Sequence, residues 1–220
     1  MLQKYFLLFL LCLGEHALYS QVIEPNLQDE TLWTVANRKA TPVNTSNKKA
    51  VSFNEVASDG LMILKGSDFS NGIVELDIKG SSKFQQSFVG FAFHMQGLQT
   101  YDALYFRPFN FKSNDAVRRS HAVQYISMPD YDWEKLRNEF PGKYENKIEN
   151  APGADDWFHV KIVVNGSHIA VFVNNAQQAS LEVEKLNANQ KGGVGLWLGN
   201  NSGGSFANLK ITKTAAAAAL

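Results

Sequence analysis

Strict alternation of apolar and polar residues limits the fold of this chain more than any other feature of its sequence. From about residue 71 onward the alternation recurs in short runs, and in 73–79 Val74, Leu76 and Ile78 alternate with charged residues. A period of two places successive side chains on opposite faces of an extended backbone. The runs therefore predict β-strands with one buried face.

The same reasoning predicts strands along most of the chain. Asn165-Gly166, between two of the runs, is a strong signal for a tight β-hairpin. Ten to twelve strands with almost no helix predict an all-β fold, a sandwich of two antiparallel sheets of the jelly-roll type. The expected strands are 33–36, 50–54, 61–65, 73–79, 88–95, 101–107, 122–127, 158–165, 168–174, 194–198 and 206–212.

One strand has an unusual outer face. In 88–95 the alternation places Val89, Phe91 and Phe93 inward and puts Gly90 and His94 on the opposite, non-core face. Small residues on that face leave room above the sheet.

The long segment 128–156 breaks the alternation and contains the one good helical pattern. An aspartate, Asp130 or Asp132, can cap a short helix that Pro141-Gly142 would end. Trp133 is expected to pack this helix onto the body of the protein. A segment this long and this rich in aromatic residues is typical of a functional loop, and we interpret it as a lid over one sheet.

The first twenty residues have the pattern of a signal peptide. Lys4 precedes an apolar run from Tyr5 to Leu13, and a polar stretch ends at Ser20. The run is too short to span a bilayer, which takes roughly 20 apolar residues. We expect a signal peptide over 1–20, one jelly-roll domain over 21–213 and a low-complexity tail over 214–220, in a secreted or periplasmic protein. Cys12 is the only cysteine, so the mature domain would have no disulfide.

Charge and cysteine content exclude several classes of protein. The chain has 21 basic and 21 acidic residues and no long run of either sign, which argues against a nucleic-acid partner. No cluster has the spacing of a zinc site and no acidic loop matches a dedicated calcium loop, so we expect no cofactor, with a structural calcium ion left open. A monomer with no membrane span is expected.

Several blocks of sequence resemble the concanavalin A-like lectin/glucanase superfamily. They are Trp157-Phe158-His159-Val160-Lys161-Ile162, Gly193-Val194-Gly195-Leu196-Trp197 and Phe206-Ala207-Asn208-Leu209-Lys210-Ile211. Two central blocks, 101–108 and 121–133, are similar to bacterial proteins near the 3-keto-disaccharide hydrolase (glycoside hydrolase family 16-like) family. The likeness covers about 26–212, and it implies a concanavalin A-like sandwich that acts on or binds carbohydrate.

The sequence departs from the glucanases at their catalytic strand. Those enzymes carry three acids as E-x-D-x-x-E, whereas here Glu75-x-Asp77 is followed by Gly80 at the third position. The two acids also fall opposite the buried face of their strand, and we interpret them as solvent-side residues.

The candidate site residues concentrate in the two central blocks and the lid. On the strand ending at Arg107, that residue and Tyr105 share a face, where an aromatic ring can stack on a sugar and a guanidinium can bind hydroxyls or a carboxylate. Pairing of Arg107 with a loop acid at the strand end is the structural alternative. Candidate catalytic groups are Asp102, His121 and Glu145. Candidate substrate-binding residues are Tyr105, Arg107, Arg119, His121, Gln124, Tyr125, Tyr131, Trp133 and Arg137.

Three functions remain open from the sequence. The first is an exported carbohydrate-binding domain with an aromatic and arginine-lined cleft. The second is a glycoside hydrolase or lyase acting on a modified saccharide, and the third is an extracellular protein-interaction domain.

Overall fold

The computed structural model describes residues 21–45 and 47–214. The predicted signal peptide, Cys12 and the alanine-rich run that ends the sequence lie outside the described residues.

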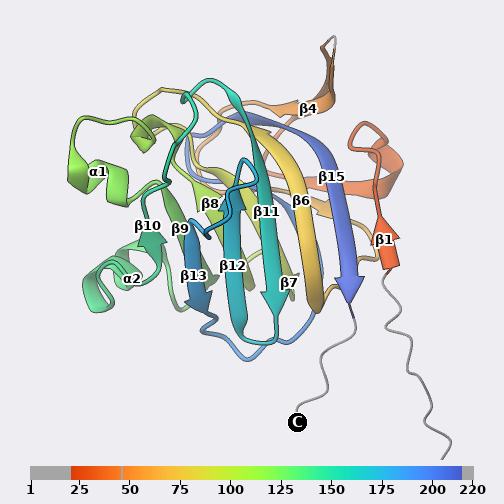
Figure 1. Ribbon diagram of the computed structural model, residues 1–220. Helices are drawn as coiled ribbons and strands as arrows, with labels where there is room; N and C mark the ends of the chain where they lie inside the picture. Colours follow the sequence, from red (N-terminus) through yellow and green to blue (C-terminus); the bar gives the residue numbers. More distant parts are fainter. Residues whose placement is uncertain (1–20, 46, 215–220) are drawn as a thin grey trace, which may run out of the picture.

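Two antiparallel sheets stack face to face, as the alternation predicted (Figure 1). The eight-stranded sheet has the spatial order β13 (Leu181–Glu184), β12 (His168–Val173), β11 (Trp157–Asn165), β6 (Asn71–Lys79), β15 (Gly204–Thr214), β4 (Lys49–Phe53) and β3 (Ala40–Asn44), with β1 (Gln21–Ile23) paired to β15. The seven-stranded sheet has the order β10 (Glu145–Asn146), β9 (Val123–Met128), β8 (Tyr101–Phe106), β7 (Val89–Met95), β14 (Gly193–Leu198), β5 (Gly60–Leu64) and β2 (Trp33–Ala36). The predicted all-β sandwich is confirmed.

The core lies between the sheets. Val74, Leu76 and Ile78 are fully buried, as their period-two spacing predicted. Phe106 of β8 and Phe158 of β11 meet edge to face across the core, with ring centroids 5.2 Å apart. The face of the seven-stranded sheet that carries Phe106 therefore packs on the other sheet, and its opposite face is free to form a site.

Two short α-helices lie on one side of the sandwich, next to β9 and β10 (Figure 1). Helix α2 (Trp133–Glu139) is the predicted helix, and the Asp132 side chain caps it by accepting from the backbone N–H of Lys135. Helix α1 (Ala116–Ser120) was not predicted, because five residues carry too little periodicity. Two 3-10 turns complete the secondary structure, η1 (Glu30–Leu32) and η2 (Pro108–Asn110). No helix among the described residues is long and apolar enough to cross a membrane.

The placement of His94 on the non-core face is wrong. His94 has a φ of +49°, and the pairing of β7 with β14 shifts register opposite it. This local irregularity turns the imidazole inward, where it is fully buried beside Phe69 and Phe93 and its Nε2 lies 2.8 Å from the Ser70 carbonyl oxygen.

Candidate functional site

A single row of paired residues crosses five strands of the seven-stranded sheet. Trp197 pairs with Gly90, Gly90 with Tyr105, Tyr105 with Gln124, and Gln124 with Glu145. Residues paired across a sheet share a face. Because the neighbouring Phe106 points into the core, this row lies on the face turned away from the other sheet.

Gly90 gives two aromatic rings of the row room to meet. The rings of Tyr105 and Trp197 are 4.8 Å apart between centroids. A Cβ atom at position 90 would come within 2.1 Å of the Leu104 carbonyl oxygen and 2.7 Å of the Tyr105 Cβ, so any other residue would push this part of β8 away. The glycine therefore helps to place this tilted pair of rings on the floor of the site.

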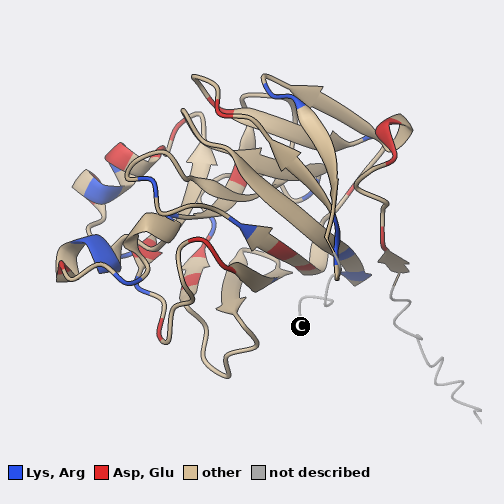
Figure 2. Ribbon diagram, turned by 90° about the horizontal axis from the view of Figure 1, so that it is seen from above, with Lys and Arg blue, Asp and Glu red and all other residues tan. Residues whose placement is uncertain are grey.

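A pocket of about 610 Å³ opens over this row. Its wall combines aromatic rings with charged and amide groups, a combination typical of sites for small polar ligands. Strands of the seven-stranded sheet and the segments around α1 and α2 contribute residues to the pocket. The basic residues of these two helices stand out in Figure 2. The lining residues are Asp59, Phe84, Gln85, Phe88, Tyr105, Arg107, Phe109, Asn110, Arg118, His121, Ile126, Met128, Asp132, Trp133, Arg137, Trp197, Gly199 and Asn200.

Arg107 is anchored by protein acceptors. Its Nη2 donates to the Tyr105 hydroxyl at 2.5 Å and to Gln124 Oε1 at 2.6 Å, and its Nη1 donates to the His121 carbonyl oxygen at 3.0 Å. The residue is 5% exposed. Most of its donors are therefore committed inside the protein, which favours a positioning role over direct capture of a ligand.

Glu145 gathers the cationic groups of the site. Its side chain is 3% exposed, and it accepts from Arg137 Nε at 3.0 Å and from Arg137 Nη2 at 2.7 Å. The Nδ1 of His121 lies 2.7 Å from Oε2, at an angle that is not an aligned hydrogen bond, and Arg107 Nη1 lies 3.8 Å away. One buried carboxylate thus holds two arginines and a histidine together, as strand β10 sets it beside β9.

His121 is neutral near pH 7. Burial lowers the pKa of its imidazole below the usual value of 6.5, and the attraction of Glu145 only partly opposes this shift. With Nδ1 turned to Glu145, Nε2 has no protein partner among the described residues. A neutral imidazole with one accessible nitrogen can act as a general base.

Trp133 does not pack its helix onto the body, contrary to the expectation from its spacing. It is 46% exposed and lines the pocket, with the Arg137 guanidinium 5.1 Å from its ring centroid. Leu136, which is 1% exposed, makes the packing contact instead.

Two of the predicted residues, Asp102 and Tyr125, lie on the opposite face of the sheet from the pocket. Asp102 shares the core face of β8 with Leu104, and its carboxylate accepts from the Tyr125 hydroxyl at 2.5 Å and from Asn187 Nδ2 at 2.8 Å. Lys185 Nζ lies 3.4 Å from the other oxygen. Burial raises the pKa of Asp102, but its polar contacts with His94, 3.6 Å away, and with the Tyr125 hydroxyl outweigh this effect, and the net shift is downward. Asp102 and Tyr125 form a buried structural cluster.

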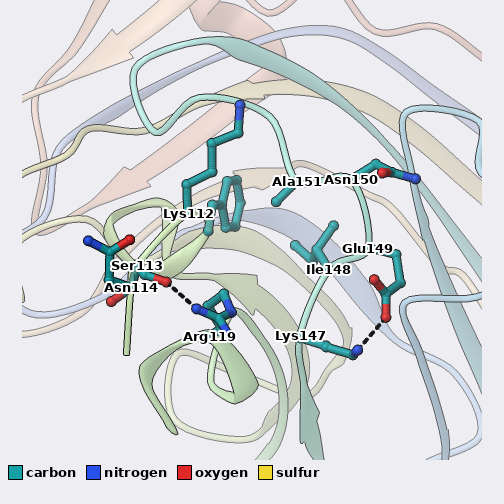
Figure 3. A pocket seen from close by; sticks show the side chains of 10 residues that line it. Lys112, Ser113, Asn114, Arg119, Lys147, Ile148, Glu149, Asn150 and Ala151 are labelled. Carbon is teal, nitrogen blue, oxygen red and sulfur yellow. Dashed lines mark hydrogen bonds and ion pairs between the residues drawn. The ribbon is translucent and has the colours of Figure 1, made fainter. Parts of the chain in front are cut away.

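Two other predicted residues also lie away from the pocket. Tyr131 pairs through its backbone with Ser127, and Lys135 covers its ring. Arg119 lines a separate hollow of about 450 Å³ beside Lys147, where its Nη1 donates to the Ser113 carbonyl oxygen at 2.6 Å (Figure 3). Gln124 does not line the pocket, since it is fully buried, and its Oε1 accepts from Arg107 Nη2.

The sequence reasoning missed several pocket residues. Trp197 carried a signal, because it alternates with the core residues Leu196 and Leu198 in an expected strand. Asp59 gave no such signal in the sequence, since it lies in an irregular stretch just before β5. Desolvation raises the pKa of the Asp59 carboxyl although the residue as a whole is exposed, and its Oδ2 accepts from the Tyr101 hydroxyl at 3.4 Å. Within the described part of the chain, no group of three histidine, cysteine or acidic side chains is arranged to hold a metal ion.

Comparison with known proteins gives one family and a set of distant structures. A family model described as a 3-keto-alpha-glucoside-1,2-lyase-like domain matches residues 26–212, nearly the span of the resemblance found in the sequence. No curated protein matches the chain.

The solved structures that resemble this chain share its fold at low sequence identity. The carbohydrate binding module CBM66 from Bacillus subtilis has a TM-score of 0.59 at 11% identity, over 82% of this chain and 95% of that one. A B. subtilis protein with a galectin-like fold has a TM-score of 0.57 at 11% identity, over 90% and 96%. The VIP36 exoplasmic/lumenal domain, in a form bound to Ca²⁺ and Man3GlcNAc, has a TM-score of 0.57 at 10% identity, over 93% and 92%. These likenesses establish the lectin-like sandwich.

Proposed function

The chain belongs to the 3-keto-alpha-glucoside-1,2-lyase-like domain family, and on that premise we propose that it binds a keto-glucoside in the 610 Å³ pocket and cleaves it by elimination. The observation that carries the proposal is the set of His121, Arg137 and Glu145 at one end of the pocket, with Asp59 also in its lining.

The pocket suits a sugar as ligand. The rings of Tyr105 and Trp197, tilted by 38° to each other, form an apolar floor, and the exposed ring of Trp133 can face the C–H face of a pyranose. Arg137 Nη1 and His121 Nε2 have no protein partner among the described residues and can hydrogen-bond to ring oxygens. Aromatic faces combined with a few polar groups support saccharide recognition.

Elimination needs a base, a stabiliser of negative charge and an acid. In a 3-keto-glucoside the C3 carbonyl acidifies the hydrogen on C2, because the electron pair left behind is delocalised onto the carbonyl oxygen. Loss of that proton to a base lets the pair form a C1=C2 double bond as the C1–O bond to the aglycone breaks. The departing oxygen takes up one proton, so no water is consumed in the cleavage step.

Each requirement has a candidate in the pocket. His121 is neutral near pH 7 and can accept the C2 proton. Arg137, held in place by Glu145, can stabilise the negative charge that develops on the carbonyl oxygen. Asp59, with its raised pKa, is the candidate that protonates the leaving oxygen. Catalytic hydrogen bonds are often loose before the substrate binds, which is consistent with the unaligned contact between His121 and Glu145.

The test is turnover of methyl 3-keto-α-glucoside in D₂O. Elimination followed by rehydration places solvent deuterium on C2 of the sugar product, whereas direct hydrolysis leaves the C2 hydrogen in place. We expect deuterium at C2, and a His121→Gln variant is expected to lose at least 100-fold in rate. His168→Gln is the matched control, because His168 is an exposed histidine of β12 that does not line the pocket.

Two results would contradict the proposal. Product with C2–H intact would mean hydrolysis, and normal turnover by His121→Gln would remove that residue as the base. Saturable binding of the keto-glucoside without any turnover would leave a carbohydrate-binding domain and refute the cleavage.

We also propose that the protein is exported. The apolar run between Lys4 and Ser20 supports a cleaved signal peptide. Mass spectrometry of the protein recovered from the periplasm or medium should give a chain that begins near Gln21, and an intact Met1 in that fraction would refute cleavage.

A further inference from the structure

A continuous series of aromatic rings runs along the pocket. Successive ring centroids are 5.6, 5.5, 6.1 and 4.8 Å apart, within the range of direct aromatic contact. All five rings line the pocket. This aromatic wall consists, in order, of Phe84, Phe109, Phe88, Tyr105 and Trp197.

The two ends of the aromatic wall differ in chemistry. At one end Tyr105 lies against Arg107, near the catalytic candidates. At the other end three phenylalanine rings offer no hydrogen-bonding group. Sugar hydroxyls need hydrogen-bond partners when they leave water, so a row of phenyl rings is a poor surface for a second sugar.

Gln85, Asn110 and Arg118 line the phenylalanine end as well, and the arginine is largely committed to the protein. Arg118 Nε donates to Asn110 Oδ1 at 3.2 Å, and its Nη2 donates to the Phe109 carbonyl oxygen at 3.1 Å. Its guanidinium carbon lies 4.4 Å from the Phe84 ring centroid. Arg118 therefore presents a flat stacked group more than a set of free donors.

Phe84 is exposed although it is a large apolar side chain. It is 55% exposed, while the phenylalanine next to it in the aromatic wall, Phe109, is 9% exposed. Because Phe84 lines the pocket, its exposed ring is available to an apolar part of a ligand. Trp133, also in the pocket lining, is exposed to 46%.

We propose that the phenylalanine end of the aromatic wall binds an aromatic aglycone, so that the substrates are aryl glycosides. The proposal rests on the function proposed above, which places the sugar beside Tyr105 and Trp197. The aglycone then extends along Phe88 and Phe109 and contacts Phe84 at the rim.

The experiment compares three 3-keto-α-glucosides that differ only in the aglycone: phenyl, methyl and a second glucose. Both the Kd and kcat/KM are measured for each compound. We expect the phenyl compound to bind at least tenfold more tightly than the other two, and to have a kcat/KM at least tenfold higher. In Phe84→Ala the ratio of the phenyl to the methyl value should fall at least threefold. Leu98→Ala is the matched control, because Leu98 is also 55% exposed and lies outside the pocket.

The outcomes separate this inference from the proposed function. Equal handling of phenyl and methyl compounds, or a preference for the second glucose, overturns the aryl assignment and leaves the cleavage intact. A phenyl preference that Phe84→Ala does not reduce also overturns it. Tighter phenyl binding without turnover supports the aglycone site and refutes cleavage, and no binding of any compound overturns both.

Discussion

Replacement of Arg107 by alanine should lower the stability of the fold much more than it weakens ligand binding. The side chain is 5% exposed and donates to three protein acceptors, on Tyr105, Gln124 and His121. From the sequence alone, Arg107 was equally a ligand contact and a structural pair. The structure favours the structural role, because its donors are already used.

The size of the effect follows from the lost contacts. A hydrogen bond to a charged group contributes about 1.5 to 3 kcal/mol. The three bonds share one guanidinium, and water from the pocket can reach part of the vacated space, so their contributions do not simply add. Breaking a buried charged network by removing one partner costs about 3 to 5 kcal/mol, and we expect Arg107→Ala to fall in that range.

Urea denaturation of the purified protein measures this loss. With a slope of about 2.5 kcal/mol per molar urea, a loss of about 4 kcal/mol moves the midpoint down by about 1.5 M. Arg119→Ala is the control, since that guanidinium is only partly buried and makes one hydrogen bond, to the Ser113 carbonyl oxygen, so solvent screening should keep the cost of its loss to about 1 kcal/mol or less. A loss below about 1 kcal/mol for Arg107→Ala, combined with weaker ligand binding, would refute the structural role.

Three other changes test the site and the fold. Because the pKa of His121 is lowered, kcat/KM should stay level near pH 7 and fall only below pH 6.5, and Glu145→Gln should move this acid limb to still lower pH in a pH–rate profile. Hydrogen bonds lower the pKa of Asp77 despite its burial, so it stabilises the protein above about pH 3.8 and loses this effect as the pH falls through the lowered folded value. Asp77→Asn should therefore cost about 1 to 3 kcal/mol at pH 7 in urea denaturation, and the cost should shrink towards pH 3. Gly90→Ala should displace Tyr105 and lower stability by about 1 to 3 kcal/mol with a change in tryptophan fluorescence, and an unaltered spectrum would contradict the close packing.

The strands could be predicted because burial imposes a simple rule on them. Val74, Leu76 and Ile78 sit in a long strand with one face on the core, so polar and apolar residues must alternate. Four strands, β1, β3, β10 and β13, were not predicted: β1 and β3 are mostly exposed and have no buried face to impose an alternation, and β10 and β13 are only two and four residues long. The rule also fails at His94, where a positive φ turns one side chain to the other face.

The site was harder to predict because it depends on pairing between strands far apart in sequence. Tyr105, Arg107 and His121 could be chosen from their composition, and they do line the pocket. Asp102 and Tyr125 lie in the same two sequence blocks, 101–108 and 121–133, yet their positions in the alternation place them on the core face of the sheet. Which face carries the site depends on how β8 packs on its partners, and no local pattern encodes that choice.

The row of paired residues across five strands has a consequence for the order of events during synthesis. Gly90 and Trp197 pair directly, although more than 100 residues separate them in the chain. Contacts between such distant residues form late, because a long loop must close before they meet. A nascent chain that has not yet released β14 from the ribosome lacks one side of the pocket, so ligand-binding ability should arise only when nearly the whole domain has emerged.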